Sequence, residues 1–240
     1  MRSNPEALRL RGMITPSDVE RLSKEPDEAL CALMNSKTAA ERTAAVRILS
    51  QRCGNSSYFI STILELLRKE QSLYTKLEIC TALENGSAET ARVMVNYLGA
   101  IGSNQHKTLP DKVSQKKSYP LARDIIARSL ASMSPAVFGV LLEVLAGQDE
   151  DKISEAIDAA GYMVFYNQQL ATEQNARVIC SLFDRFHGNP VIVWKAITCL
   201  SAFPLQSSIK ALQQIKERYP DTLLYSEACR SLKLIDSRLK

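Results

Sequence analysis

The residues best suited to bind a charged ligand gather in one polar stretch, residues 102–118, and in the segment just after it. Residues 103–128 contain six Lys or Arg and two Asp, a net charge of +4, whereas residues 129–188 carry a net charge of −5. Ammonium and guanidinium groups beside aromatic rings can hold a phosphate, an acidic peptide or a nucleic-acid backbone. The candidate partner- or anion-binding residues are His106, Lys107, Lys112, Lys116, Lys117, Tyr119, Arg123, Arg128 and Trp194.

Several of these candidates have a structural alternative. Helices in compact arrays are joined by short turns, so a loop as long as 102–118 is either functional or disordered, and its lysines could serve only to keep it solvated. Arg123 and Arg128 could form structural ion pairs with neighbouring helices. Trp194 lies in the apolar run 191–197, a setting that favours a packed ring over an exposed one that stacks on a ligand.

No group of residues has the composition and spacing of a catalytic or metal site. His106 and His187 are the only histidines, and the sequence contains no Walker phosphate loop or GxSxG elbow. The acidic residues at 143–158 cross a predicted helix–helix turn, where carboxylates stabilise the start of a helix. The sequence therefore predicts no cofactor and no metal, and it favours a protein that is not an enzyme.

Helices must position the candidate residues. The chain is 45% hydrophobic and 23% charged, and it lacks long β-branched runs, which is typical of an all-α protein. Apolar residues recur at helical spacing between turn-forming pairs such as Asn-Gly and Ser-Pro. After short helices within residues 1–35, this pattern predicts helices over 38–52, 57–69, 73–84, 88–101, 120–133, 135–146, 150–166, 172–187, 190–202, 206–218 and 222–237.

The six cysteines and the lengths of the apolar runs indicate the cellular compartment in which the protein is expected. The cysteines form no CxxC pair and fall in apolar helical patterns, which favours reduced thiols over disulfides. The first residues lack the apolar core of a signal peptide, and no apolar run approaches the roughly 20 residues that cross a bilayer. We therefore expect a soluble, cytoplasmic protein without membrane contact.

A pair of small or aliphatic residues four positions apart recurs in every second predicted helix. The first members of successive pairs are 30–47 residues apart. The largest spacing contains an insertion of roughly 12–15 residues before residue 119, and without it this spacing agrees with the others. We expect about six stacked helical hairpins in a single domain over 1–240, because one hairpin cannot bury its apolar face alone. Residues 1–35 would cap this stack, and 102–118 would be an inserted basic loop. The pairs are Ala45/Leu49, Ile79/Leu83, Ile126/Leu130, Ala156/Ala160, Ala196/Leu200 and Ala228/Leu232.

The second helices of these hairpins resemble the HEAT-repeat family, whose pattern approximates Pro-x-x-Arg-x-x-Ala-x-x-x-Leu. The family's Asp-Pro turn occurs here only as Asn189-Pro190. The resemblance implies a right-handed α–α superhelix, a HEAT-like or armadillo-type solenoid, whose second helices line a concave face. The residues that carry it are Pro120, Arg123, Ile126 and Leu130, more loosely Pro190, Lys195, Ala196 and Leu200, and in part Arg42 and Lys76.

The resemblance supports a fold and not a particular activity. The repeat, together with the missing catalytic cluster, favours a non-enzymatic scaffold that binds a protein partner on its concave face, aided by loop 102–118. The alternative is a nucleic-acid-binding protein, including an enzyme similar to the HEAT-like DNA glycosylases. Those enzymes use aromatic and Asp/Arg residues on a strongly basic surface, whereas this chain has one Trp and an acidic block at 143–158. A third possibility, an enzyme-associated subunit similar to those related to phycobilin lyases, rests on analogy of fold.

Overall fold

The computed structural model describes residues 4–54 and 56–239, and the elements in this part of the chain are all helical. It contains 14 α-helices and three short 3-10 helices, with no β-strand among the described residues. The all-α prediction is therefore confirmed. The chain divides into two compact units, Met1–Met94 and Val95–Lys240, and each is described by itself. The single domain expected over 1–240 stays a prediction.

Unit 1 is built around its longest helix, α4, which contacts the three short N-terminal helices and α6. The first three helices all pack on α4, α5 packs on α6, and α6 packs along α4. The helices are α1 (Pro5–Leu10), α2 (Pro16–Leu22), α3 (Asp27–Leu33), α4 (Ala39–Cys53), α5 (Ser57–Lys69), α6 (Leu73–Glu84) and α7 (Ala88–Met94).

The turn after α1 lies against α4 and α6, and this contact depends on a glycine. The carbonyl of Arg11 accepts the N–H of Tyr74 at 3.0 Å. Gly12 has a φ of 91°, and a Cβ there would stand 2.8–2.9 Å from the hydroxyls of Thr43 and Thr75. Both the left-handed backbone and the close approach require glycine at this position.

Unit 2 has two layers of helices. The second helices α8, α10, α12 and α14 pack on one another in sequence, and the first helices α9, α11 and α13 form the other layer. The elements are η1 (Val95–Tyr97), α8 (Ile125–Ser132), η2 (Pro135–Val137), α9 (Phe138–Ala146), α10 (Glu150–Tyr166), η3 (Gln168–Leu170), α11 (Glu173–Arg185), α12 (Pro190–Leu200), α13 (Gln206–Arg218) and α14 (Leu223–Leu239).

The residue pairs predicted from the repeat lie in the cores of the two units. All of their members are buried except Leu232, which is half-buried. Burial of this face explains why small residues recur there, since alanines let neighbouring helices approach closely. No single helix in the described part of the chain is both long and apolar enough to cross a membrane, although Ile125–Ser132 and Pro135–Ala146 would qualify together and are bent by 118°.

The helix predicted over 88–101 was too long. The α-helix ends at Met94 and continues only as the 3-10 helix η1. Gly99 and Gly102 follow with φ values of 75° and 81°. An α-helix cannot continue through residues with positive φ, so the chain leaves the helix and enters the long loop.

The helix predicted over 120–133 begins later than expected, at Ile125. Asp124 is its N-cap, and the Oδ1 atom of that side chain accepts the N–H of Ala127 at 2.8 Å. An N-cap residue has a non-helical backbone, so the helix cannot extend back through Asp124. Pro120 and Arg123, which the HEAT pattern would place in the first turn, therefore lie in the segment before the helix.

Candidate functional site

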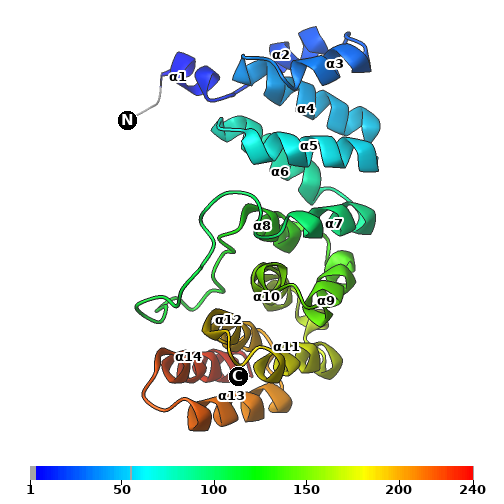
Figure 1. The fold of residues 1–240 in the computed structure, drawn as a ribbon. Coiled ribbons are helices and arrows are strands. Elements are labelled where there is room, and N and C mark those ends of the chain that lie inside the picture. Colours follow the sequence, from blue (N-terminus) through cyan, green and yellow to red (C-terminus); the bar gives the residue numbers. More distant parts are fainter. Residues whose placement is uncertain (1–3, 55, 240) are drawn as a thin grey trace. The chain divides into compact units, whose positions relative to one another are not determined.

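The basic loop, residues 102–118, lies against the second helices of unit 2. Figure 1 shows it running past α8, α10 and α12 toward α14. Near its start, the His106 ring meets the edge of the Trp194 ring, with the centroids 4.8 Å apart. Near its end, Arg230 on α14 donates to the carbonyl of Lys116 at 3.0 Å. The loop is therefore held on the helices at both of these points.

The base of the loop is tied by one buried carboxylate. Asp124 is fully buried, and its Oδ2 atom accepts a hydrogen bond from Gln105 Nε2 at 2.8 Å and from the N–H of Gly99 at 3.3 Å. Gln105 also donates to the carbonyl of Ile101 at 2.9 Å. A single carboxylate thus ties the beginning of the loop to the start of α8.

Tyr119 is an anchor for the loop rather than a group presented to a partner. The side chain is buried, and its ring packs against Phe165 and Tyr162 at centroid distances of 5.7 and 6.5 Å. A Cβ at Gly161 would overlap the Tyr119 hydroxyl, so glycine makes room for it. Burial raises the pKa of Tyr119 well above its usual value, which keeps the phenol neutral.

A cavity of about 240 Å³ lies between the basic loop and helices α10, α12 and α14. We call it the loop cavity. One wall comes from the loop and the segment that follows it, and the other comes from the three second helices. The lining residues that matter for binding are His106, Lys112 and Arg123 on the first wall, and Trp194, Lys195 and Arg230 on the second.

The helix wall contains a buried ammonium group paired with two carboxylates. Lys195 is 1% exposed, and its Nζ lies 2.9 Å from Glu155 Oε1 and 2.9 Å from Asp158 Oδ2. Burial lowers the pKa of Lys195, but the two carboxylates raise it by more, so the ammonium stays charged. Burial raises the pKa of Glu155, and the charge of Lys195 offsets only part of that rise. This cluster holds α10 and α12 together.

The remaining acid of the cavity is also satisfied internally. Glu227 on α14 is buried, accepts the indole N–H of Trp194 at 3.3 Å and pairs with Arg230 at 2.8 Å. Trp194 is half-buried, as its apolar neighbours predict, and it joins α12 to α14 through this bond. Both acidic side chains that line the cavity, Asp158 and Glu227, are thus neutralised by cations of the same wall.

Two cations that line the loop cavity have no ion-pair partner among the described residues. Lys112 and Arg123 line it, are exposed, and form no hydrogen bond or ion pair with any residue that the structure describes. His106 adds no charge at neutral pH, because burial and then the positive charge of Arg123 lower its pKa. The site therefore offers an ammonium and a guanidinium group to an incoming anion.

The other candidates lie outside the loop cavity. Lys107 faces Asp151 at 3.7 Å, an exposed pair that contributes little. Lys116 and Lys117 are exposed on the loop. Arg128 donates from Nε and Nη2 to the carbonyl of Ala122 at 3.0 and 2.8 Å, and so closes the segment before α8. The structure thus brings together His106, Lys112, Arg123 and Trp194, and it uses Tyr119 and Arg128 as supports.

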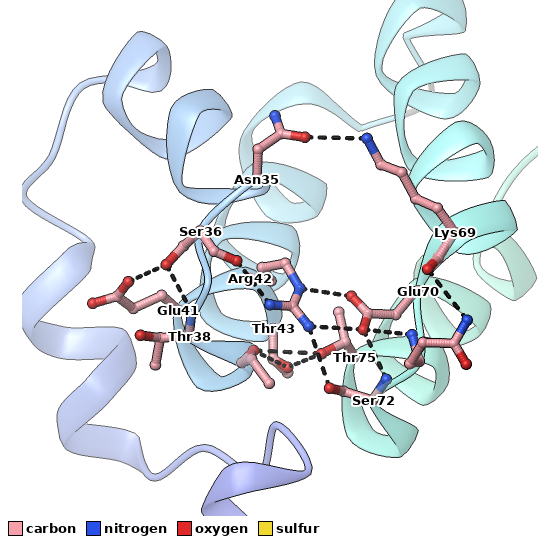
Figure 2. Close-up of polar contacts among 12 residues, drawn as sticks. Asn35, Ser36, Thr38, Glu41, Arg42, Thr43, Lys69, Glu70, Ser72 and Thr75 are labelled. Atoms are coloured by element: carbon pink, nitrogen blue, oxygen red, sulfur yellow. Dashed lines mark hydrogen bonds and ion pairs between the residues drawn. The ribbon is translucent and has the colours of Figure 1, made fainter.

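Unit 1 shows the opposite arrangement for the arginines of α4, which pair with carboxylates of neighbouring segments. Figure 2 shows the Arg42 guanidinium bonded to both oxygens of Glu70, at 2.7 and 2.8 Å. Glu70 also accepts the N–H groups of Gln71 and Ser72. Burial alone would raise the pKa of Glu70, but these hydrogen bonds lower it below its usual value. The Thr43 and Thr75 hydroxyls share a hydrogen bond of 2.9 Å between α4 and α6.

Sequence reasoning missed the buried clusters around Lys195 and Glu227. For Lys195 a signal was present, because Lys195 and Glu155 are about one repeat apart, at 40 positions. Aligning the repeats and searching for opposite charges on consecutive second helices would have found that pair, whereas Glu227 and Arg230 lie three residues apart on one helix. In the described ranges, no three His, Cys, Asp or Glu side chains converge as metal ligands.

Comparisons with known proteins identify no relative. No protein-family model matches the sequence, and no curated protein matches it. Three crystal structures of engineered proteins from the Northeast Structural Genomics Consortium are similar at 18–19% identity, with TM-scores of 0.43, 0.42 and 0.41. The matches cover 88%, 89% and 96% of this chain, and 96%, 99% and 64% of those chains.

Proposed function

We propose that this chain is a HEAT-like solenoid of about six hairpins that binds an acidic protein partner and carries out no chemistry of its own. The binding surface is the face of α10, α12 and α14 together with the basic loop. The observation that supports this proposal most directly is the state of Lys112 and Arg123. They are exposed and unpaired at a cavity whose other charges are satisfied within the protein.

The repeat supports the HEAT-like part of the proposal. Within unit 2, first and second helices alternate along the chain and sort into separate layers. Within each unit, the buried residue pairs recur on the second helices at repeat spacing. Stacked hairpins of this kind place the polar side of their second helices on one face, where a partner can contact several repeats at once. The six free cysteines support a reduced, cytoplasmic location.

A protein suits the surface better than a nucleic acid. A second hollow of about 330 Å³ borders His106 on another side and is lined by Asp149, Glu150, Asp151 and Glu155. A chain of phosphates that followed the basic loop would meet these carboxylates, whereas a polypeptide can present a base there. Trp194 is engaged by His106 and Glu227, so its ring is not a free platform for stacking on a base.

The first experiment is affinity capture from native extract with the wild-type chain and with a variant that carries Lys107→Ala, Lys112→Ala, Lys116→Ala, Lys117→Ala and Arg123→Ala. A captured protein is identified, purified and titrated against both chains. We expect an acidic partner whose affinity falls by at least about tenfold in the variant, since each lost charge-assisted hydrogen bond weakens binding. Equal affinity for both chains would remove the loop from the binding surface.

A filter-binding titration tests the nucleic-acid alternative. Phosphate contacts release counterions, so a nucleic-acid complex weakens steeply as salt is raised. We expect weak binding of single- and double-stranded DNA and RNA at physiological salt. Tight binding with a steep salt dependence that the five alanine substitutions abolish would favour the alternative over the protein partner.

A further inference from the structure

The volume of the loop cavity limits what can enter it. At about 240 Å³ it is smaller than the roughly 300–1,000 Å³ of pockets that enclose drug-sized ligands. A folded surface or a helix cannot enter a space of this size, but one side chain from an extended segment can. The cavity is therefore suited to a single anchoring side chain of a larger partner.

The charges that line the cavity select the sign of that side chain. Lys195 pairs with both Asp158 and Glu155, and Arg230 pairs with Glu227. Lys112 and Arg123 are the surplus, because they have no carboxylate partner among the residues that the structure describes. A guanidinium group presents parallel N–H donors that match the two oxygens of a carboxylate, and a neighbouring ammonium group adds a second contact. An anionic group balances this surplus, whereas a basic side chain would be repelled.

The Arg230 guanidinium on the helix wall is already bound within the protein. Its side chain is 11% exposed, Nη1 pairs with Glu227 at 2.8 Å, and Nη2 donates to the carbonyl of Lys116 at 3.0 Å. Its Nε is buried from solvent. Lys112 and Arg123 are therefore the cations that the cavity offers to an incoming ligand.

The apolar part of the lining distinguishes a carboxylate on a stem from a bare anion. Pro110, Pro120 and Leu121 line the cavity with the Trp194 ring, and Leu121 is 59% exposed. Methylene groups of a side chain would cover this apolar surface, whereas a bare phosphate would leave it in water. We propose that the loop cavity is an anchor site for one glutamate or aspartate side chain from an extended acidic segment of a protein partner. This inference rests on the proposed function.

The anchor site carries its own reporter, because Trp194 is the only tryptophan of the chain. A hexapeptide of alternating Glu and Leu, blocked at both ends, is titrated while the Trp194 emission is followed, and calorimetry repeats the titration. The matched peptide replaces Glu by Gln, and inorganic phosphate is the third ligand. We expect a saturable change with the Glu peptide and at least about tenfold weaker binding of the Gln peptide and of phosphate, since both lose part of the contact.

Single substitutions test the assignment. Lys112→Gln and Arg123→Gln should each weaken binding of the Glu peptide by about tenfold. Lys117→Gln is the matched control, because Lys117 is also exposed on the loop and does not line the cavity. Its affinity should stay within about twofold of wild type, since a screened surface charge contributes little. All three positions are exposed, so circular dichroism should show unchanged helix content.

Three results would overturn the anchor site: no binding of the Glu peptide by either readout, equal binding of the Gln peptide or phosphate, or equal loss in the Lys117→Gln control. Failure of the anchor site can be told from failure of the proposed function. If the single variants keep their peptide affinity but the five-alanine variant loses the captured partner, only the anchor site is wrong. If the five-alanine variant keeps that partner, the proposed function is wrong as well.

Discussion

The second helices of the two units use charge in different ways. In unit 1, the arginines of α4 pair with carboxylates of neighbouring segments: Arg42 with Glu70 at the end of α5, Arg47 with Glu78 on α6, and Arg52 with Asp27 on α3. In unit 2, Lys195 is satisfied in the same manner, but Lys112 of the inserted loop and Arg123 of the segment after it pair with no carboxylate in the described part of the chain. The comparison indicates that ion pairs between repeats maintain the fold, while the insertion supplies the charges available to a partner.

The largest effect should come from breaking the buried cluster of unit 2. Lys195→Met would leave Glu155 and Asp158 without their cation in a buried setting. We expect the free energy of unfolding to fall by about 3–5 kcal/mol, as measured by urea denaturation. Lys117→Met, at an exposed position, is the control and should change it by less than about 0.5 kcal/mol. Equal stability of the two variants would show that the cluster does not hold α10 to α12.

The paired face of unit 1 should respond to Glu70→Gln, which removes the charge that Arg42 binds. We expect a loss of about 2–3 kcal/mol at pH 7, because the Arg42 guanidinium keeps only weaker acceptors. The folded-state pKa of Glu70 lies below its ordinary value, so its stabilisation is present above about pH 4.3 and is lost as the pH falls through the folded-state pKa.

The pH dependence sharpens this prediction. The difference in unfolding free energy between wild type and Glu70→Gln should be largest at neutral pH and should shrink below about pH 4. Glu20→Gln, which replaces an exposed carboxylate, is the control and should change the unfolding free energy at pH 7 by less than about 0.5 kcal/mol. A difference that grows on acidification would contradict the direction assigned to the pKa of Glu70.

A smaller effect should follow from the contact that anchors the loop in unit 2. Gly161→Ala would place a methyl group where the Tyr119 hydroxyl lies. We expect a loss of about 1–3 kcal/mol from overpacking, measured by urea denaturation. Combining it with Tyr119→Leu should give a smaller loss than the sum of the single changes, because both act at one contact. Additive losses would mean that Tyr119 does not occupy this space.

Much of the fold could be predicted because local signals and burial agree. Helices over 57–69, 73–84, 150–166 and 206–218 have the predicted bounds, since each combines an apolar face with clear breakers at its ends. The start of α8 was missed because Pro120 resembles a first-turn residue. Only the folded loop shows that Asp124 is the N-cap and that Gln105 and Gly99 bind its other oxygen.

The long basic loop could be predicted from the sequence, but its contacts could not, and its role as a binding site stays a prediction. The net charge and length of 102–118 identified the loop, because both are properties of composition. Which cations remain free depends on contacts between residues far apart in sequence, such as Arg230 with the carbonyl of Lys116. Burial of Tyr119 depends on the absence of a side chain at Gly161, on another helix. Such contacts leave no local signal.

The most direct test of the central claim is to remove the same charges from each unit and measure partner affinity. One variant carries Lys112→Gln and Arg123→Gln in unit 2, and the matched variant carries Lys24→Gln and Arg68→Gln at exposed positions of unit 1. Each is titrated against the purified partner obtained by capture. We predict at least about tenfold weaker binding for the unit 2 variant and wild-type affinity for the unit 1 variant. Equal affinities of the two variants would contradict the claim that the inserted loop supplies the binding charges.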